Sequence, residues 1–193
     1  MDGCLAGPNQ GADAPFGEGA DGLHRWMFEE AEANAAELKE MNAAGAFIMG
    51  RNMFGPGRGE WDLDWTGWWG PEPPYHNPVF VLTHHERPSV QMQGGTTFHF
   101  VTGGMTEALK RAQAAASDQN IAIAGGAATV NQFLAAGLID ELRLHIAPVL
   151  LGRGERLFEG VGATDLMQLD VRHTKLVTHT RYSVPRHAAS QAK

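Results

Sequence analysis

Apolar residues gather in short runs that end at glycine or threonine, a pattern typical of buried β-strands. Four such runs occupy residues 46–49, 79–83, 97–101 and 121–124. The first run precedes Gly50, the second ends in Thr83, and the fourth precedes Gly125. Short apolar runs bounded by turn-forming residues suit strands that are buried on both faces, as in parallel sheets. We therefore predict four strands that share one buried sheet.

Three segments between and after these runs have the composition and spacing of helices. Residues 26–41 are dense in helix-forming residues, which predicts one amphipathic helix. Its apolar positions at helical spacing are Met27, Ala31, Ala35 and Leu38. A second helix is predicted from a cap at Thr106 to about residue 116, and a third from Ala127 to a stop at Gly137.

The last third of the chain changes to an alternating pattern. Residues 142–146 alternate apolar with polar side chains and predict a strand that continues to residue 151 and ends at the turn 152–154. Residues 166–171 and 175–184 predict a terminal hairpin. Strands that alternate with helices and then end in a hairpin indicate an α/β fold, with a mostly parallel sheet and an antiparallel edge.

Two segments read as loops. Residues 1–22 are rich in Gly, Ala, Pro and Asp, and residues 55–78 hold four of the five tryptophans. A long loop that carries tryptophan is typical of a lid or binding loop rather than a linker. The tryptophans either wall a pocket for a flat ligand or anchor the loop on the core or in a dimer contact. The length suits one domain, which we place at residues 1–184, with a polar tail at 185–193.

Composition narrows the classes of function. The formal net charge of −7 argues against nucleic-acid and membrane partners, and requires a local basic site for any anionic cofactor. With one cysteine no intramolecular disulfide can form, and no apolar run approaches the ~20 residues of a membrane span. No signal peptide is recognised, so a cytoplasmic protein is expected. The nine histidines show no metal-ligand spacing, so no metal site is predicted.

The first candidate binding element is the glycine pair after the fourth strand. Gly125 and Gly126 allow a ligand close to the backbone, and the helix that follows offers unpaired N–H groups to a phosphate. The candidate residues here are Gly125, Gly126, Ala127, Ala128 and Thr129. A tight strand-to-helix turn, with glycines needed only for geometry, is the alternative interpretation.

Two further candidates also follow strands. Gly50, Arg51, Asn52 and Met53 follow the first strand, and a guanidinium can bind phosphate bidentately. The second strand leads into a cluster that could hold a 2′-phosphate, formed by Thr83, His84, His85 and Arg87. A solvated arginine and a polar loop are the respective alternatives. Ligands of open parallel sheets bind outside the carboxyl ends of the strands, so we expect the three turns to lie at one edge.

The order of these segments resembles the dihydrofolate-reductase-like superfamily. It is most similar to the group related to the C-terminal reductase domain of the bifunctional riboflavin-biosynthesis deaminase–reductase. The matching strings run to about residue 184. They are Met1-Asp2-Gly3 with Ala6-Gly7-Pro8, Ile48-Met49-Gly50-Arg51, Val81-Leu82-Thr83, Ala124-Gly125-Gly126, Gly137-Leu138-Ile139-Asp140-Glu141-Leu142 and Pro148-Val149-Leu150-Leu151-Gly152.

The resemblance implies a three-layer α/β/α fold, a homodimer and NADPH as cofactor, with hydride transfer to a polarised C=N or C=O carbon. It implies that residues 50–53 face a cofactor phosphate, that residues 83–85 lie near the adenosine 2′-phosphate, and that residues 125–129 hold the pyrophosphate. Relatives begin with a strand ahead of the opening string, so we expect that first strand to be missing here. The segment after residue 51 departs from the riboflavin reductases, which leaves the substrate open.

No catalytic acid is assigned. Glu29, Glu30 and Glu32 lie on the first predicted helix, where a solvated helix face is the simpler interpretation, and Asp2 is expected to shape its loop. We expect an NADPH-dependent reductase acting on a pterin-like, ribosylaminopyrimidine-like or carbonyl substrate, in a pocket closed by residues 1–20 and the tryptophan loop. A nucleotide-binding module without turnover and a dimeric scaffold are the alternatives.

Overall fold

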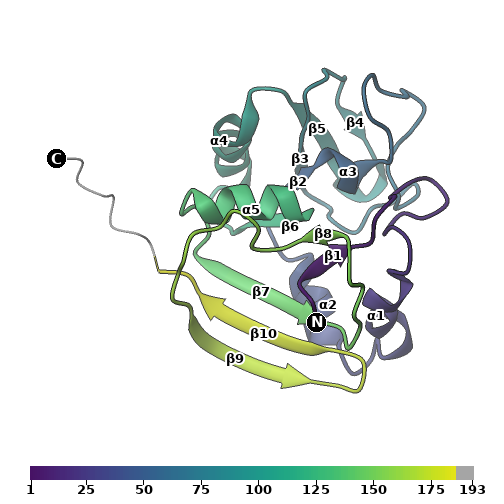
Figure 1. The fold of residues 1–193 in the computed structure, drawn as a ribbon. Coiled ribbons are helices and arrows are strands. Elements are labelled where there is room, and N and C mark those ends of the chain that lie inside the picture. The colour runs from purple at the N-terminus through teal and green to yellow at the C-terminus, as the bar shows by residue number, and fades with distance from the viewer. Residues whose placement is uncertain (186–193) are drawn as a thin grey trace.

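A central five-stranded sheet organises the upper part of the molecule (Figure 1). In this computed structural model, which describes residues 1–185, the strand order is β4-β5-β3-β2-β6. The strands are β2 (Ala46–Gly50), β3 (Pro78–Leu82), β4 (Val90–Gln91), β5 (Thr97–Val101) and β6 (Ile121–Gly125). All pairings are parallel except the edge pair β4–β5. The predicted mostly parallel sheet with an antiparallel edge is confirmed.

Helices and a loop cover the two faces of this sheet. On one face, Ile48 and Phe80 pack against Ala108, Ala112 and other residues of α4 (Gly104–Ala116) and against Phe133 of α5 (Ala127–Ala135). On the other face, Phe47 and Val81 pack against α3 (Arg51–Phe54) and the tryptophan loop. The third layer is therefore a short helix together with an aromatic loop.

A second, three-stranded antiparallel sheet lies below the first (Figure 1). Its order is β7-β10-β9, formed by β7 (Glu141–Ile146), β9 (Met167–His173) and β10 (Thr178–Ser183). The terminal hairpin is thus confirmed. The prediction that the strand beginning at residue 142 continues to 151 is wrong, because β7 ends at Ile146. Pro148 has no N–H to donate to a ladder, and the carbonyl of Val149 instead accepts the amino group of Met1 at 2.9 Å.

The predicted helix 26–41 is two helices, α1 (Arg25–Glu29) and α2 (Ala35–Met41). Asn34 lies between them, fully buried, and its amide donates to the carbonyl of Glu30 at 2.9 Å. A side chain that bonds the backbone in this way competes with helix formation. The predicted apolar face is also wrong, because Trp26 is the buried residue of α1 and α2 buries none of its own.

Residues 1–22 are mostly loop, as predicted, but they contain β1 (Cys4–Ala6) and the short 3₁₀ helix η1 (Asp21–Leu23). β1 pairs antiparallel with β8 (Glu155–Arg156), directly after the 152–154 turn (Figure 1). A further 3₁₀ helix, η2, spans Gln93–Gly95. The second predicted helix begins at Gly104, with Gly103 rather than Thr106 at its cap. The tail 186–193 lies outside the described residues, and the domain boundary at 184 stays a prediction.

Candidate functional site

The carboxyl ends of three neighbouring parallel strands meet at one edge of the central sheet. Gly50 at the end of β2 pairs with Leu82 of β3, and Met49 pairs with Gly125 of β6. Because β2 lies between β3 and β6, the turns after these three strands lie side by side. The expected common edge is therefore present, with residues 83–85 on one side of β2 and residues 125–129 on the other.

The glycine pair forms an open corner at the start of α5. The Gly125–Gly126 peptide is cis, and Gly125 has φ +127°, a backbone conformation that favours glycine. A Cβ at Gly126 would meet no atom within 4 Å, so space is open beside the first turn of the helix. The amides of Thr129 and Val130 donate to the carbonyl of Gly126, whereas those of Ala127 and Ala128 have no acceptor within the helix. The corner fits an anionic group held by backbone N–H donors.

Gly50 and Thr129 bring the candidate turns at residues 50–53 and 125–129 into contact. A Cβ at Gly50 would stand 2.6 Å from Oγ1 of Thr129, which is itself buried. The Met53 sulfur would lie 3.2 Å from a Cβ at Gly125. The hydroxyl of Thr129 therefore lies against β2, and the residues of this turn that adjoin open space are Gly126 and Ala128.

The guanidinium of Arg51 is bonded to the tryptophan loop. It donates to the carbonyls of Gly57 at 3.0 Å, Gly59, and Glu60 at 3.2 Å, and lies 3.8 Å from the ring centre of Trp61. Burial lowers the pKa of Arg51 from its ordinary value, although the group remains charged at any physiological pH. A phosphate can therefore bind Arg51 only if it replaces some of these hydrogen bonds to backbone carbonyl groups.

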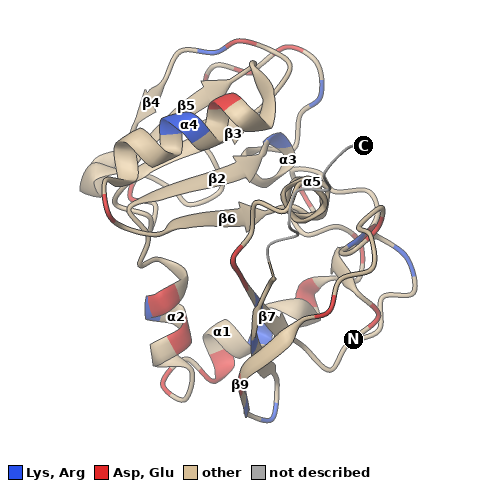
Figure 2. Cartoon of the chain, turned by 90° about the vertical axis from the view of Figure 1, so that its left-hand side faces the viewer, with Lys and Arg blue, Asp and Glu red and all other residues tan. Residues whose placement is uncertain are grey.

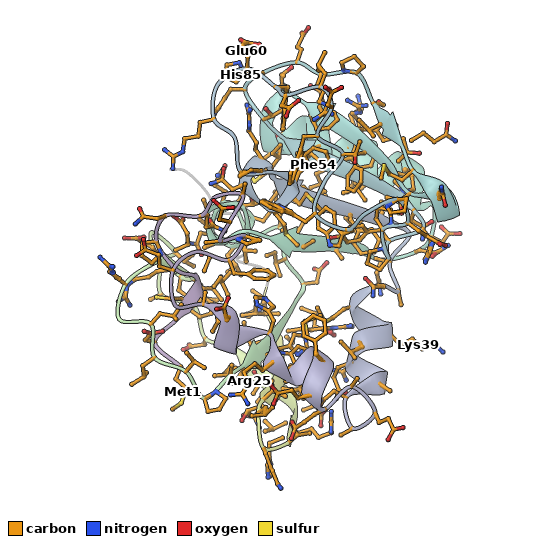
Figure 3. All side chains as sticks on the ribbon, turned by 90° about the vertical axis from the view of Figure 1, so that its right-hand side faces the viewer. Met1, Arg25, Lys39, Phe54, Glu60 and His85 are labelled. Atoms are coloured by element: carbon orange, nitrogen blue, oxygen red, sulfur yellow. The ribbon has the colours of Figure 1, made fainter. Side chains whose placement is uncertain are left out.

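The turn at residues 83–85 is closed by its own hydrogen bonds. The buried hydroxyl of Thr83 accepts the amide of His85 at 3.1 Å, a local turn that occupies the hydroxyl. His85 Nδ1 lies 3.1 Å from a carboxylate oxygen of Glu60, and Figure 3 shows the two side chains adjacent at the surface. His84 is exposed. Of the three predicted residues, only His84 presents a free ring to solvent.

A small polar cavity opens beside α3. Its volume is about 280 Å³, and it lies between the N-terminal loop, α3, the tryptophan loop and β8. It is lined by Gly7, Asn9, Gln10, Asn52, Pro56, Arg58, Trp68 and Glu155. A pocket closed by residues 1–20 and the tryptophan loop was expected. Of the residues predicted to bind cofactor, Asn52 alone lines the cavity.

The structure places three tryptophans of the loop on the core and one beside the cavity, so loop anchoring is confirmed and a role in ligand binding stays a prediction. Trp61, Trp65 and Trp69 pack against the core around Phe54, an interior residue in Figure 3. Trp68 lines the cavity. The loop is also held by the buried Arg87, whose guanidinium donates to the carbonyls of Leu63 and Trp65.

Arg58 and Glu155 were not predicted from the sequence, whereas Arg87, predicted as part of the polar cluster after the second strand, is bonded to the tryptophan loop. Glu155 follows a segment that the sequence predicts only as a turn, and no local pattern distinguishes Arg58. Only the folded arrangement of four distant segments identifies these residues.

The acidic residues considered for catalysis lie elsewhere. Glu29 forms an ion pair with Arg25 at 2.7 Å, and Glu30 accepts the backbone amide of Leu176 at 3.2 Å. Both belong to the α1–α2 region, below the central sheet in Figures 1 and 2. The carboxylate of Asp2 accepts the amide of Gly152 at 2.6 Å, and this hydrogen bond lowers the pKa of Asp2. Asp2 thus shapes the loop beside it, as expected.

Within residues 1–185, no group of three or more acidic, histidine or cysteine side chains is arranged to hold a metal ion. In the same part of the chain, no helix is long and apolar enough to cross a membrane.

Comparisons with known proteins identify the family and the fold. The family model of the RibD C-terminal domain matches residues 2–183. No curated protein matches the chain. Among solved structures, a “Putative riboflavin biosynthesis protein” from Shewanella sp. PV-4 is 25% identical, with a TM-score of 0.58 over 77% of this chain and 78% of that one.

Two more distant structures share the fold. A pyrimidine reductase-like protein from Corynebacterium diphtheriae is 17% identical, with a TM-score of 0.52 over 80% of this chain and 82% of that one. The Thermotoga maritima diaminohydroxyphosphoribosylaminopyrimidine deaminase/5-amino-6-(5-phosphoribosylamino)uracil reductase is 11% identical, with a TM-score of 0.53 over 96% of this chain and 54% of that one. Because the family model spans nearly the whole described chain, the protein belongs to the RibD C-terminal domain family, a reductase-type group of the dihydrofolate-reductase-like superfamily.

Proposed function

We propose that this protein is an NADPH-dependent reductase that transfers hydride to a small heterocyclic or carbonyl substrate. The observation that carries the proposal is the open corner at Gly126, where the first amides of α5 face space beside the ends of β2 and β6. Membership of the RibD C-terminal domain family supports the reductase chemistry. Pterin-like and ribosylaminopyrimidine-like rings are the heterocycles that this resemblance favours.

In this proposal each candidate turn has a defined role. Residues 125–129 hold the pyrophosphate through backbone amides, and residues 50–53 lie beside the adjoining phosphate. Residues 83–85 lie near the adenosine 2′-phosphate, with exposed His84 as the side chain available to it. When bound, NADPH supplies the hydride. The chain's own contribution is to orient the cofactor and substrate and to exclude water from the reacting atoms.

The quaternary structure belongs to the same proposal. β9 is an outer strand of its sheet, and Met167, Leu169 and Val171 on it are 43–63% exposed. An exposed apolar edge strand is a surface that proteins normally cover, and a second copy of the chain covers it most simply with two-fold symmetry. We therefore propose a homodimer that works in the cytoplasm.

Thermal unfolding with NADPH and with NADH tests the proposal. Both cofactors at equal concentration should raise the melting temperature, NADPH by more, because a ligand that binds only the folded state stabilises it. NADPH oxidation is then followed with pterins, quinones and ribosylaminopyrimidines. Absence of a shift with either cofactor rules out the reductase. A shift without oxidation of NADPH by any of these compounds would favour a nucleotide-binding module, an alternative consistent with the remote positions of Glu29 and Glu30.

A further inference from the structure

The cavity beside α3 is lined by two opposite charges that have no partner among the described residues. Within residues 1–185, neither Glu155 nor Arg58 forms an ion pair or a side-chain hydrogen bond. Nearby charged residues do have partners. Glu60 contacts His85, Arg153 pairs with Glu18, and Arg156 donates to the carbonyl of Asp2. An acid and a base that line one small cavity without pairing are available to a ligand.

The backbone at Glu155 is constrained, and its side chain is exposed. β8 pairs with β1, which places Glu155 opposite Ala6. The approach is so close that a Cβ on the preceding Gly154 would lie 2.0 Å from the carbonyl oxygen of Ala6. A charged side chain on a rigid, paired strand holds its position better than one on a free loop.

The N-terminal loop, which continues directly from β1, is equally constrained. The amide of Gly7 donates to the carbonyl of Phe16 at 2.8 Å, and the amide of Glu18 donates to the carbonyl of Pro8 at 2.8 Å. A Cβ at Gly7 would stand 2.2 Å from the carbonyl oxygen of Glu18. The N-terminal loop therefore presents Asn9 and Gln10 from a closed, hydrogen-bonded scaffold.

The neutral side chains of the cavity add hydrogen-bonding groups and one aromatic surface. The amide of Asn52 has no partner within the described residues, while the Gln10 amide nitrogen donates to the carbonyl of Pro15 at 3.1 Å, leaving the Gln10 oxygen free to accept. Trp68 is held edge-to-face against Trp65, with ring centres 4.6 Å apart, and is half-buried. An indole fixed in this way suits stacking on a flat ring.

The size of the cavity limits its ligand. Its volume of about 280 Å³ lies just below the ~300–1,000 Å³ that is usual for small-molecule pockets, so it suits one or two rings rather than a dinucleotide.

We infer that Glu155 and Arg58 are the specificity-determining residues of this cavity. They select a small flat heterocycle with an amidine-type N–H edge for the carboxylate and an anionic edge for the guanidinium. Hydrogen bonds to a carboxylate and from a guanidinium are stronger than those between neutral groups, and each would hold one edge of the ring. The inference rests on the proposed function in one respect, since it makes this cavity the substrate site of the reductase.

Three pyrimidines of similar size test the inference by calorimetric titration. Isocytosine offers the amidine N–H edge without a carboxylate, orotate offers a carboxylate without the amidine edge, and 2-amino-6-oxo-1,6-dihydropyrimidine-4-carboxylate offers both. The third probe should bind at least about tenfold more tightly than either of the others, the factor expected for one added charge-assisted bond. Equal affinity for all three probes overturns the inference.

Two substitutions test which charged residue contacts which edge of the ligand. Glu155→Gln should weaken isocytosine about tenfold without weakening orotate, and Arg58→Gln should do the reverse. Glu159→Gln and Arg111→Gln are the matched controls, because these two residues carry the same charges but do not line this cavity. Unchanged affinities in both cavity variants overturn the inference, as does equal weakening of all probes.

Titrations without and with NADPH separate this inference from the proposed function. If the cavity variants change probe affinity as expected but NADPH does not bind, the ligand assignment holds and the reductase fails. If NADPH binds and the probe affinities do not respond to either charge, the cavity assignment fails alone.

Discussion

Gly50 is the residue at which the candidate turns depend most directly on one another. A Cβ at this position in β2 would lie 2.6 Å from Oγ1 of Thr129 in α5. Gly50→Ala should therefore lower the free energy of unfolding by about 1–3 kcal/mol, the usual cost of overpacking. Urea unfolding followed by circular dichroism measures it.

The same contact can be tested by a double-mutant cycle. Thr129→Ala removes the obstructing hydroxyl, so Gly50→Ala should cost less in that background, with a coupling of about 0.5–3 kcal/mol. If the two substitutions are additive within experimental error, the close packing of β2 on α5 is not what requires glycine at this position.

At the scale of elements, a buried polar network joins α1 and α2 to the second sheet. His145 Nδ1 on β7 and His179 Nδ1 on β10 are 2.7 Å apart, and Trp26 packs against both rings. The Nε2 atom of His179 lies 3.0 Å from Oδ1 of Asn34, which also accepts from Arg172. Because that oxygen can only accept, His179 carries its proton on Nε2 and its Nδ1 accepts from His145.

This network predicts a loss of stability in acid. Burial, followed by the neighbouring His179, lowers the pKa of His145 to about 4, below the 6.5 of an ordinary histidine. The neutral form is therefore favoured in the fold, and its contribution to stability is present above pH 6.5 and lost as the pH falls from 6.5 towards 4. The free energy of unfolding should fall less steeply over this range in His145→Asn than in the parent. Parallel pH profiles for the two proteins would exclude His145 as the source.

The tryptophan loop is the second element whose order depends on a few contacts. Arg87 is buried, donates to two carbonyls of the loop, and lies within 5.4 Å of the ring centres of Phe54, Trp61 and Phe100. Lysine keeps the charge but loses the planar fork that reaches both carbonyls. Arg87→Lys should therefore speed amide hydrogen exchange in residues 61–66, with Arg111→Lys as the control. Exchange rates equal to those of the parent would show that the loop is held without Arg87.

Sequence patterns predicted the elements unevenly, for physical reasons that differ between them. The parallel strands were found because burial on both faces leaves continuous apolar runs, as in residues 46–49. The break in 26–41 was not found, because it depends on Asn34 being bonded by Arg172 and His179, which are more than a hundred residues away. Two of the turns at the sheet edge were found from glycine positions, whereas Glu155 and Arg58 line one cavity only through tertiary packing.

At the scale of the whole molecule, the exposed edge at β9 predicts self-association. Leu169 is 43% exposed on this outer strand, and a charge there should disfavour burial against a second copy. Leu169→Lys should shift the protein from dimer to monomer in sedimentation velocity. Leu150→Lys, at a leucine that is 75% exposed outside the strands, is the matched control. A parent protein that is monomeric at micromolar concentration would contradict the dimer.

The affinity of NADPH for Gly126→Val tests the central claim most directly. The corner at Gly126 has open space where a Cβ would stand, and its φ is one that other residues adopt, so the variant should fold while its side chain fills the proposed pyrophosphate site. Gly162→Val is the matched control, because that glycine is also open and has no left-handed φ. Fluorescence titration should show NADPH binding to the parent and to Gly162→Val, and none to a folded Gly126→Val. Unchanged affinity in Gly126→Val would contradict a cofactor site at the glycine pair.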